Sequence, residues 1–183
     1  MALAACLTLI AALSVTAPAL AAGGAAACPP ATGAQPDTAN READEQATLC
    51  LINRIRAAHH LRALHGNPQL TSVADSQAVS MVASDWFSDV RPGGVTPLAL
   101  VGSTSYRSHA ATIAVGQNIA WGTGGFSTPA HIVSEWMASP PHRAIILTRG
   151  YRDAGISIEP GVPSVLHAGH AGATYAMEFG RRY

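Results

Sequence analysis

Histidine and acidic side chains are the groups in this chain best able to move protons or bind metals. The chain has 8 histidines. His131 and Glu135 stand four residues apart and could share a metal ion, although a solvated helix face has the same spacing. His59 and His60 directly follow a predicted helix, and such side chains can stabilise the C-terminal end of a helix through its dipole. The sequence has no HExxH, GxSxG, phosphate-binding loop or paired-cysteine zinc motif, so no general signature assigns a reaction.

The N-terminal segment indicates where such chemistry would take place. Residues 1–22 are almost wholly apolar and end in an A-x-A cleavage signal at 19–21, which predicts a signal peptide rather than an uncleaved anchor. No basic residue precedes the apolar run, which is unusual for a signal peptide. No later segment is long and apolar enough to cross a membrane. We therefore expect a secreted, extracellular protein.

The cysteines fit that location. Of the 3 cysteines, Cys6 lies in the predicted signal peptide, which leaves Cys28 and Cys50. An even number in an oxidising compartment predicts a disulfide between them, worth about 3 kcal/mol in the loop-closure model, and two unpaired thiols are the alternative.

Charge limits the classes of partner. Lys+Arg and Asp+Glu both number 11, every basic residue is arginine, and the net charge is +0. We therefore expect no basic field that would attract nucleic acid or anionic lipid. Length after cleavage suits one domain, and we expect a monomer.

Helical signals come first along the chain. After a Gly/Ala/Pro-rich leader at 23–39, acidic residues followed by arginines predict a helix over 40–58, with Leu51, Ile55 and Ala58 on its apolar face. Asn67-Pro68 predicts the start of a second helix. Gln77 falls on the apolar face of that helix and must be hydrogen-bonded there.

The second half of the chain mixes elements. Residues 89–114 show no sustained hydrophobic periodicity, so we expect a loop-rich stretch there. We expect a strand over 115–121. Thr128-Pro129 predicts a third helix that ends at 139–141, with a short further turn over 142–147. The alternation of side chains between the two faces of a strand predicts strands at 154–158 and 173–179, joined by a loop. Helices first and antiparallel strands last favour an α+β fold.

Several segments in fixed order resemble one family. They are 50–56 (CLINRIR), 67–70 (NPQL), 116–120 (GQNIA, similar to GENIA), 136–147 (WMASPPHRAIIL, similar to WMxSPGHRANIL) and 172–180 (GATYAMEFG). On these segments the chain resembles the bacterial branch of the CAP superfamily, the SCP-like extracellular proteins. The resemblance implies a domain over 40–183 with an α-β-α sandwich, a small antiparallel sheet between helical layers. It also implies a central cleft with two histidines and two acidic residues, in some members around a divalent metal.

Family positions transfer to this chain one at a time. His142 matches the histidine of the GHR motif, and Gln77 stands where many bacterial members have an extra histidine. Asp89 stands where the FSH segment has its histidine, Gln117 replaces the glutamate of GEN, and Ser139 lies where eukaryotic members carry a second glutamate.

These replacements weaken the case for catalysis. Gln117 lacks the charge of a general base or strong metal ligand. His142 and Asp89 are the candidate ligands for a divalent metal such as zinc, but zinc sites use three or four protein ligands. Structural roles remain open, since His142 could be a hydrogen-bonded structural histidine, and Asp89 and Gln117 could stabilise loops.

Three functions follow from the resemblance. The first is a non-catalytic extracellular module that binds a cell-envelope component, a lipid or a secreted protein. The second is a metal-assisted, peptidase-like hydrolase that uses His142 and Asp89, although no nucleophile-plus-base pair is evident. The third is a lipid or sterol carrier with a cavity between helices. We favour the first.

Overall fold

The computed structural model describes residues 28–29, 33–167 and 170–183. The predicted signal peptide (1–22), with Cys6, lies outside the described residues. The elements follow in the order α1 (Arg41–Ala58), β1 (His65–Gly66), α2 (Pro68–Ala83), α3 (Pro97–Gly102), η1 (Ser105–Arg107), β2 (Ile113–Thr123), η2 (Gly124–Ser127), α4 (Pro129–Ala138), α5 (Pro140–Ile146), β3 (Asp153–Pro160), α6 (Ser164–His167) and β4 (Gly172–Arg182). None of the described helices is long and apolar enough to span a bilayer.

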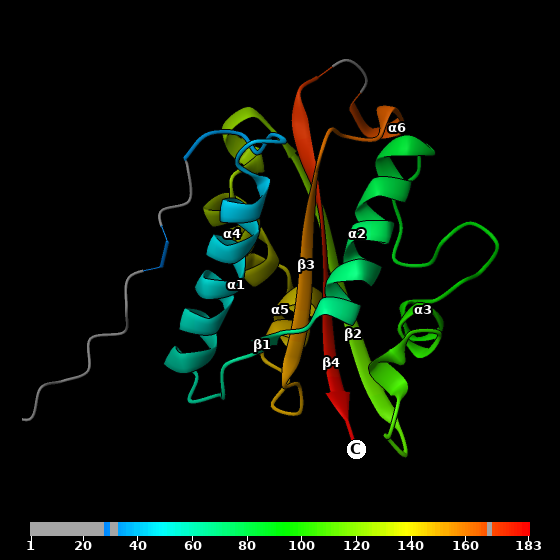
Figure 1. The fold of residues 1–183 in the computed structure, drawn as a ribbon. Helices are drawn as coiled ribbons and strands as arrows, with labels where there is room; N and C mark the ends of the chain where they lie inside the picture. Colours follow the sequence, from blue (N-terminus) through cyan, green and yellow to red (C-terminus); the bar gives the residue numbers. More distant parts are fainter. Residues whose placement is uncertain (1–27, 30–32, 168–169) are drawn as a thin grey trace, which may run out of the picture.

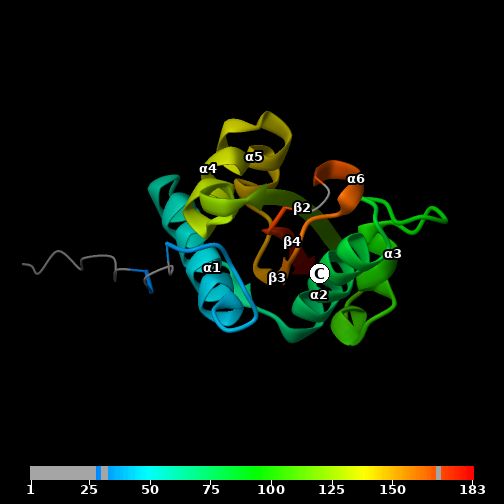
Figure 2. The same ribbon diagram turned by 90° about the horizontal axis from the view of Figure 1, so that it is seen from above.

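The elements form three layers. A four-stranded sheet in the order β1-β3-β4-β2 lies between α1, α4 and α5 on one face and α2 and α3 on the other (Figures 1 and 2). β4 pairs antiparallel with both β2 and β3, and the short β1 pairs parallel with β3. The expected α+β sandwich is confirmed, with one parallel edge strand that the sequence did not predict.

The central strand β4 alternates between the two layers. Tyr175, Met177 and Phe179 belong to the apolar cluster under α1, α4 and α5. Ala176, between them, belongs to the cluster formed with α2. Glu178 has the same parity as Ala176, so its side chain lies on the α2 side of the sheet.

The predicted helix starts are confirmed. The Asn67 side chain accepts hydrogen bonds from the backbone N–H groups of Gln69 and Leu70, both at 3.1 Å, and Pro68 takes the first position of α2. Thr128 likewise precedes Pro129 at the start of α4, although its side chain donates to the Gly125 carbonyl and does not cap the helix. The stretch expected to be a loop, 89–114, contains α3 and η1, and β2 is longer than predicted at both ends.

The buried face of α1 differs from the prediction. Leu51 and Ile55 are only partly buried and Ala58 is exposed, whereas Ile52 and Arg56 are fully buried. The Arg56 guanidinium can be buried because it donates to backbone carbonyls of the segment that joins α1 to β1 and of the segment between α5 and β3. Its acceptors are the carbonyls of Arg62 at 3.0 Å, Ile146 at 2.6 Å, Thr148 at 3.1 Å and Tyr151 at 3.4 Å. A buried arginine with satisfied donors thus occupies a position that hydrophobic periodicity assigns to an apolar residue.

The disulfide connects the leader to α1. The sulfurs of Cys28 and Cys50 are bonded, with 22 residues of sequence separation between them. The predicted pairing is therefore present in the structure.

Candidate functional site

A cleft of about 370 Å³ lies along the edge strand β2. Its walls come from β2, from the loop after α2, from η2, and from α4 and α5. The lining residues are Phe87, Ile119, Ala120, Trp121, Phe126, His131, Ile132, Glu135, Trp136, Ser139 and His142. The cleft therefore combines aromatic surface with a few polar groups, as ligand sites generally do.

His142 is held at the cleft from two directions. Its Nδ1 is 2.8 Å from the Oγ of Ser139, the residue that precedes α5. Its backbone carbonyl accepts a hydrogen bond of 3.2 Å from the side-chain amide of Asn118 on β2. Two sequence-predicted site residues, His142 and Ser139, are thus brought together, and the ring orientation is fixed by the hydroxyl.

Asp89 approaches the same cleft from the opposite layer. It lies in the loop after α2, two residues beyond the cleft residue Phe87. Partial desolvation raises the pKa of the Asp89 carboxyl, and the nearby His142 opposes that rise. Asp89 from the α2 layer and His142 from the α5 layer therefore lie within electrostatic range of each other at the edge of the sheet.

A buried carboxylate lies beneath this pair. Gln117 on β2 is directly opposite Glu178 on β4, and its Nε2 donates to Glu178 Oε1 at 2.5 Å. Glu178 is 0% exposed. Burial is the main reason that the pKa of Glu178 is raised to about 7. The Gln117 hydrogen bond and the charge of Arg91 oppose the rise, and the charge of Asp89 adds to it.

Three buried side-chain oxygens on β2 and β4 have no hydrogen-bond partner among the described residues. They are Gln117 Oε1, Asn118 Oδ1 and Glu178 Oε2. Buried polar atoms normally find a donor, so their environment suits a donor group or an ordered water. Gln117 and Glu178 lie on the α2 side of the sheet and Asn118 on the α5 side, and none of the three lines the cleft, so these oxygens belong to the packed sheet beneath it.

Gln77 supports the site from behind. As expected, it is buried and hydrogen-bonded on the apolar face of α2. Its Nε2 donates to the Ser88 carbonyl at 3.0 Å, and its Oε1 accepts from Arg91 Nε at 2.8 Å. Gln77 thereby fixes the loop that carries Asp89 and positions Arg91 near Glu178.

Sequence reasoning missed Glu178 and Arg91. The signal for Glu178 was present, because a single acidic residue inside the otherwise apolar strand 173–179 must be buried with partners or protonated. Arg91 carried no such signal. Its role depends on a loop whose path is set by Gln77 and by the backbone pairing of Arg91 with Val95.

The site does not fit a bound metal ion. Zinc takes three or four protein ligands, and the described part of the chain contains no group of three or more His, Cys, Asp or Glu side chains placed to hold an ion. His131 and Glu135 both line the cleft, with His131 Nε2 3.9 Å from Glu135 Oε1, and His131 also packs against the ring of Phe126. The i, i+4 pair thus lies together on the cleft wall, where it forms an ion pair only when His131 is protonated.

Ser139 and His142 form a hydroxyl–imidazole pair that the sequence did not reveal. Acyl transfer through such a serine needs N–H donors to stabilise the oxyanion. Pro140 and Pro141 follow Ser139 and have no backbone N–H, and the N–H of Arg143 already donates to the Ser139 carbonyl at 2.9 Å. The first turn of α5 therefore offers an anion fewer N–H donors than a helix N-terminus usually does, with His142 as the residue whose N–H is left.

A separate apolar groove lies between α1 and α4. It has a volume of about 440 Å³ and is lined by Leu51, Arg54, Ile55, Ala58, Ala130 and Val133. The partly buried apolar residues of α1 face this groove, so it is where the lipid-carrier hypothesis applies.

Comparison with known proteins gives one family. Residues 49–162 match the model of the Cysteine-rich secretory protein family, CAP. No functionally curated protein matches the sequence.

Solved structures with a similar fold come from several bacteria. An outer surface protein of Borrelia burgdorferi matches with a TM-score of 0.63 and 17% identity, over 81% of this chain and 98% of its own. An extracellular protein containing an SCP domain from Bacillus anthracis matches with a TM-score of 0.58 and 24% identity, over 78% and 41%. A cysteine-rich secretory protein from Staphylococcus aureus matches with a TM-score of 0.56 and 19% identity, over 78% and 40%. At these identities the similarity establishes the fold alone.

Proposed function

The chain belongs to the cysteine-rich secretory protein (CAP) family, and we propose that it is a secreted binding module whose edge-strand cleft holds a component of the cell envelope. The family match agrees with the resemblance read from the sequence motifs. The signal peptide predicted at 1–22 and the Cys28–Cys50 disulfide support an extracellular location.

One observation carries this proposal: His142, held by Ser139 and Asn118, lines an aromatic cleft, and Asp89 from the opposite helical layer lies within electrostatic range of it. A ligand that fits presents hydroxyl, amide or ammonium donors to these groups and an apolar face to Trp121 and Phe126. Sugars and peptides of the cell wall have that combination of groups.

The experiment is co-sedimentation of the secreted, disulfide-bonded protein with purified peptidoglycan, and Trp121 and Trp136 report soluble fragments by fluorescence. Asp89→Asn and His142→Ala should each weaken binding about tenfold, because each removes one charge-assisted or polar contact. Glu42→Gln and His59→Ala change the same residue types at exposed positions on or after α1 and should leave binding unchanged. Unchanged affinity in both cleft variants would refute the proposal.

Hydrolysis is the second candidate, because the structure places a hydroxyl and an imidazole 2.8 Å apart in the cleft. Release of soluble fragments from the same peptidoglycan, or cleavage of a broad peptide pool, measures it directly. Product formation that disappears in both Ser139→Ala and His142→Ala would establish an enzyme and overturn the non-catalytic reading. We expect no product, since the two prolines after Ser139 remove two of the backbone N–H groups that could stabilise an oxyanion.

The lipid-carrier alternative concerns the apolar groove between α1 and α4 and needs its own test. Native mass spectrometry of the secreted protein reports a stoichiometric lipid directly. Retention of a lipid that Ile55→Glu abolishes would favour that alternative, because Ile55 lines the apolar groove between α1 and α4.

A further inference from the structure

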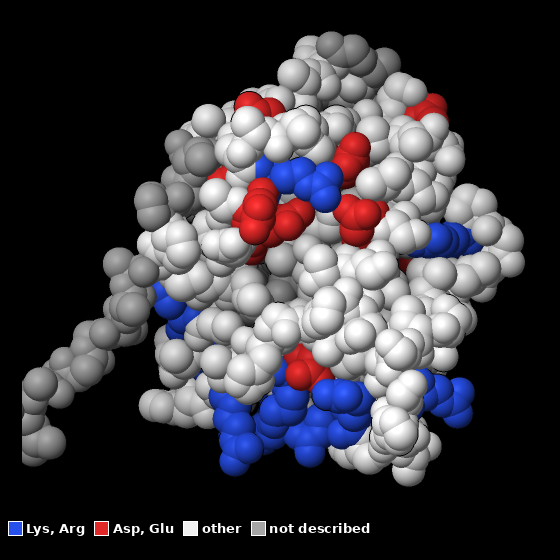
Figure 3. All heavy atoms as spheres, in the orientation of Figure 1, with Lys and Arg blue, Asp and Glu red and all other residues white. Residues whose placement is uncertain are grey.

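Arginines gather at one end of the molecule, away from the cleft. Figure 3 shows most of the visible basic side chains at the lower end and most of the acidic ones in the upper half. The acidic group is Glu45, Asp75 and Glu159 around Arg41. We call the lower group the arginine end; its members are Arg62, Arg107, Arg149, Arg152, Arg181 and Arg182.

Contacts between neighbouring segments join these arginines into one surface. Arg152 and Arg181 both donate to the Gly150 carbonyl, so the α5–β3 connection and the end of β4 are adjacent. Arg182 stacks over Tyr106, which precedes Arg107. The Arg62 carbonyl accepts from Arg56, whose guanidinium also reaches Thr148 next to Arg149.

Few carboxylates neutralise this end. In the segments 62–66, 105–113, 149–153 and 180–183 the sequence has a single acidic residue, Asp153. Its carboxylate accepts a 2.7 Å hydrogen bond from the Tyr106 hydroxyl and lies 4.0 Å from Arg182. The exposed side chains of Arg107 and Arg149 have no carboxylate partner among the described residues. The expectation of no basic field, drawn from a net charge of zero, is therefore wrong for this surface.

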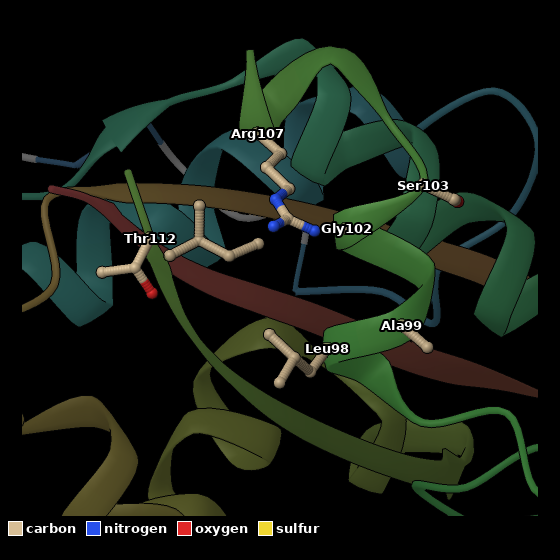
Figure 4. Close-up of a pocket in the computed structure, with 7 residues that line it drawn as sticks. Leu98, Ala99, Gly102, Ser103, Arg107 and Thr112 are labelled. Atoms are coloured by element: carbon tan, nitrogen blue, oxygen red, sulfur yellow. The ribbon is translucent and has the colours of Figure 1, made fainter. Parts of the chain in front are cut away.

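A pocket of about 530 Å³ adjoins the arginine end. It lies between α3, η1 and the start of β2, and Figure 4 shows the Arg107 guanidinium directed into it, with Leu98 on one side and Thr112 on the other. Ile113, which also lines it, is paired with Arg182 on β4. Apolar side chains are exposed beside the cations: Leu98 is 54% and Tyr183 59% exposed.

We propose that the arginine end docks on an anionic, phosphate-bearing lipid surface, with the head-group phosphates held by the arginines and the adjoining pocket over the lipid interface. The planar guanidinium group can donate two parallel hydrogen bonds to a phosphate, and it stays positively charged at any physiological pH. The exposed Leu98 and Tyr183 favour a lipid surface over a soluble polyanion, since apolar side chains gain from contact with the interface but not from a phosphate chain in water. This surface is distinct from the cleft, and the proposal holds whichever ligand the cleft takes.

The test is co-sedimentation of the disulfide-bonded protein with vesicles of phosphatidylcholine alone or mixed with phosphatidylglycerol. The variant Arg107→Gln/Arg149→Gln removes two exposed charges that form no side-chain hydrogen bond in the described structure. Its control, Arg143→Gln, removes one exposed charge elsewhere and is compared with Arg107→Gln alone. We expect binding to the anionic vesicles only, about tenfold weaker in the first variant and within about twofold in the control.

Two further measurements separate the sources of phosphate. Leu98→Ser should weaken vesicle binding but leave binding of soluble inorganic polyphosphate unchanged. No binding to anionic vesicles, or equal losses in Arg107→Gln and in the control Arg143→Gln, would overturn the proposal. Binding of polyphosphate as tight as that of vesicles, with no effect of Leu98→Ser on either, would assign the surface to a soluble polyanion instead.

Discussion

At the scale of single residues, the unusual feature is a carboxyl group placed where its charge is disfavoured. Glu178 lies in the middle of the sheet, and its one hydrogen-bond donor is Gln117. The neighbouring Asp89 adds repulsion, which Arg91 offsets only in part. The group therefore holds its proton to a pH of about 7, well above the ordinary 4.5 of a glutamic acid. A neutral Glu178 leaves Asp89 as the charged acid of the site.

Glu178→Gln should change how stability depends on pH. Because the folded-state pKa is raised, the folded protein keeps a proton that the unfolded chain loses between about pH 4.5 and 7. The contribution of this group to the free energy of unfolding is thus fully present at low pH and is lost as the pH rises to about 7. We expect the variant to match the wild type near pH 4 and to exceed it by up to about 3 kcal/mol at pH 8.

Urea unfolding across that pH range measures the difference between the two proteins. Glu42→Gln, at an exposed position of α1, should follow the wild-type curve throughout. A Glu178→Gln curve parallel to the wild type would mean that Glu178 is charged in the folded protein at neutral pH.

At the scale of elements, the contact between α2 and the sheet positions the site. Gly155, Glu178 and Gln117 form one row across β3, β4 and β2, on the face that α2 covers. A Cβ at Gly155 would overlap the backbone of Leu70 and Thr71 in the first turn of α2. The missing side chain therefore lets α2 lie close enough for Gln77 to hold the loop that carries Asp89.

Gly155→Ala should destabilise the fold by about 3 kcal/mol, since the helix must move off the sheet to admit one methyl group. The measurement is the free energy of unfolding in urea. Gly66→Ala adds a methyl group where nothing lies within 4 Å, and it should change stability by no more than about 0.5 kcal/mol. Equal effects of the two substitutions would contradict the close approach of α2.

At the scale of the whole molecule, the disulfide and the distribution of charge are properties that no single element contains. The Cys28–Cys50 bond closes a loop with 22 residues of separation and ties the segment before α1 to that helix. Its stabilisation comes mainly from restricting the unfolded chain, a term of about 3 kcal/mol for a loop of this length.

The double variant Cys28→Ser/Cys50→Ser should therefore lose about 3 kcal/mol of unfolding free energy relative to the oxidised protein. Reductant should lower the urea midpoint of the wild type to that of the variant and leave the variant unchanged. A wild type that is insensitive to reductant would show that the bond contributes nothing to stability.

Local signals were sufficient to predict much of this protein. Asn67-Pro68 and Thr128-Pro129 mark helix starts because a cap residue followed by proline needs no distant partner. Alternation over 173–179 marks a strand, and the cysteine count indicated the disulfide. The motifs around Gln117 and His142 identified the family and two of the residues at the site.

Only tertiary structure decided the rest, because the remaining features depend on partners far apart in the chain. Arg56 replaces the predicted apolar face of α1 because carbonyls of distant segments satisfy its guanidinium. The two-residue β1 exists through its pairing with β3. Glu178 became a site residue only because the strand register places Gln117 opposite it. The basic end of a chain with zero net charge arises because folding separates these arginines from most of the carboxylates. Each is a non-local contact, whose energy comes from burial and pairing that no stretch of sequence contains.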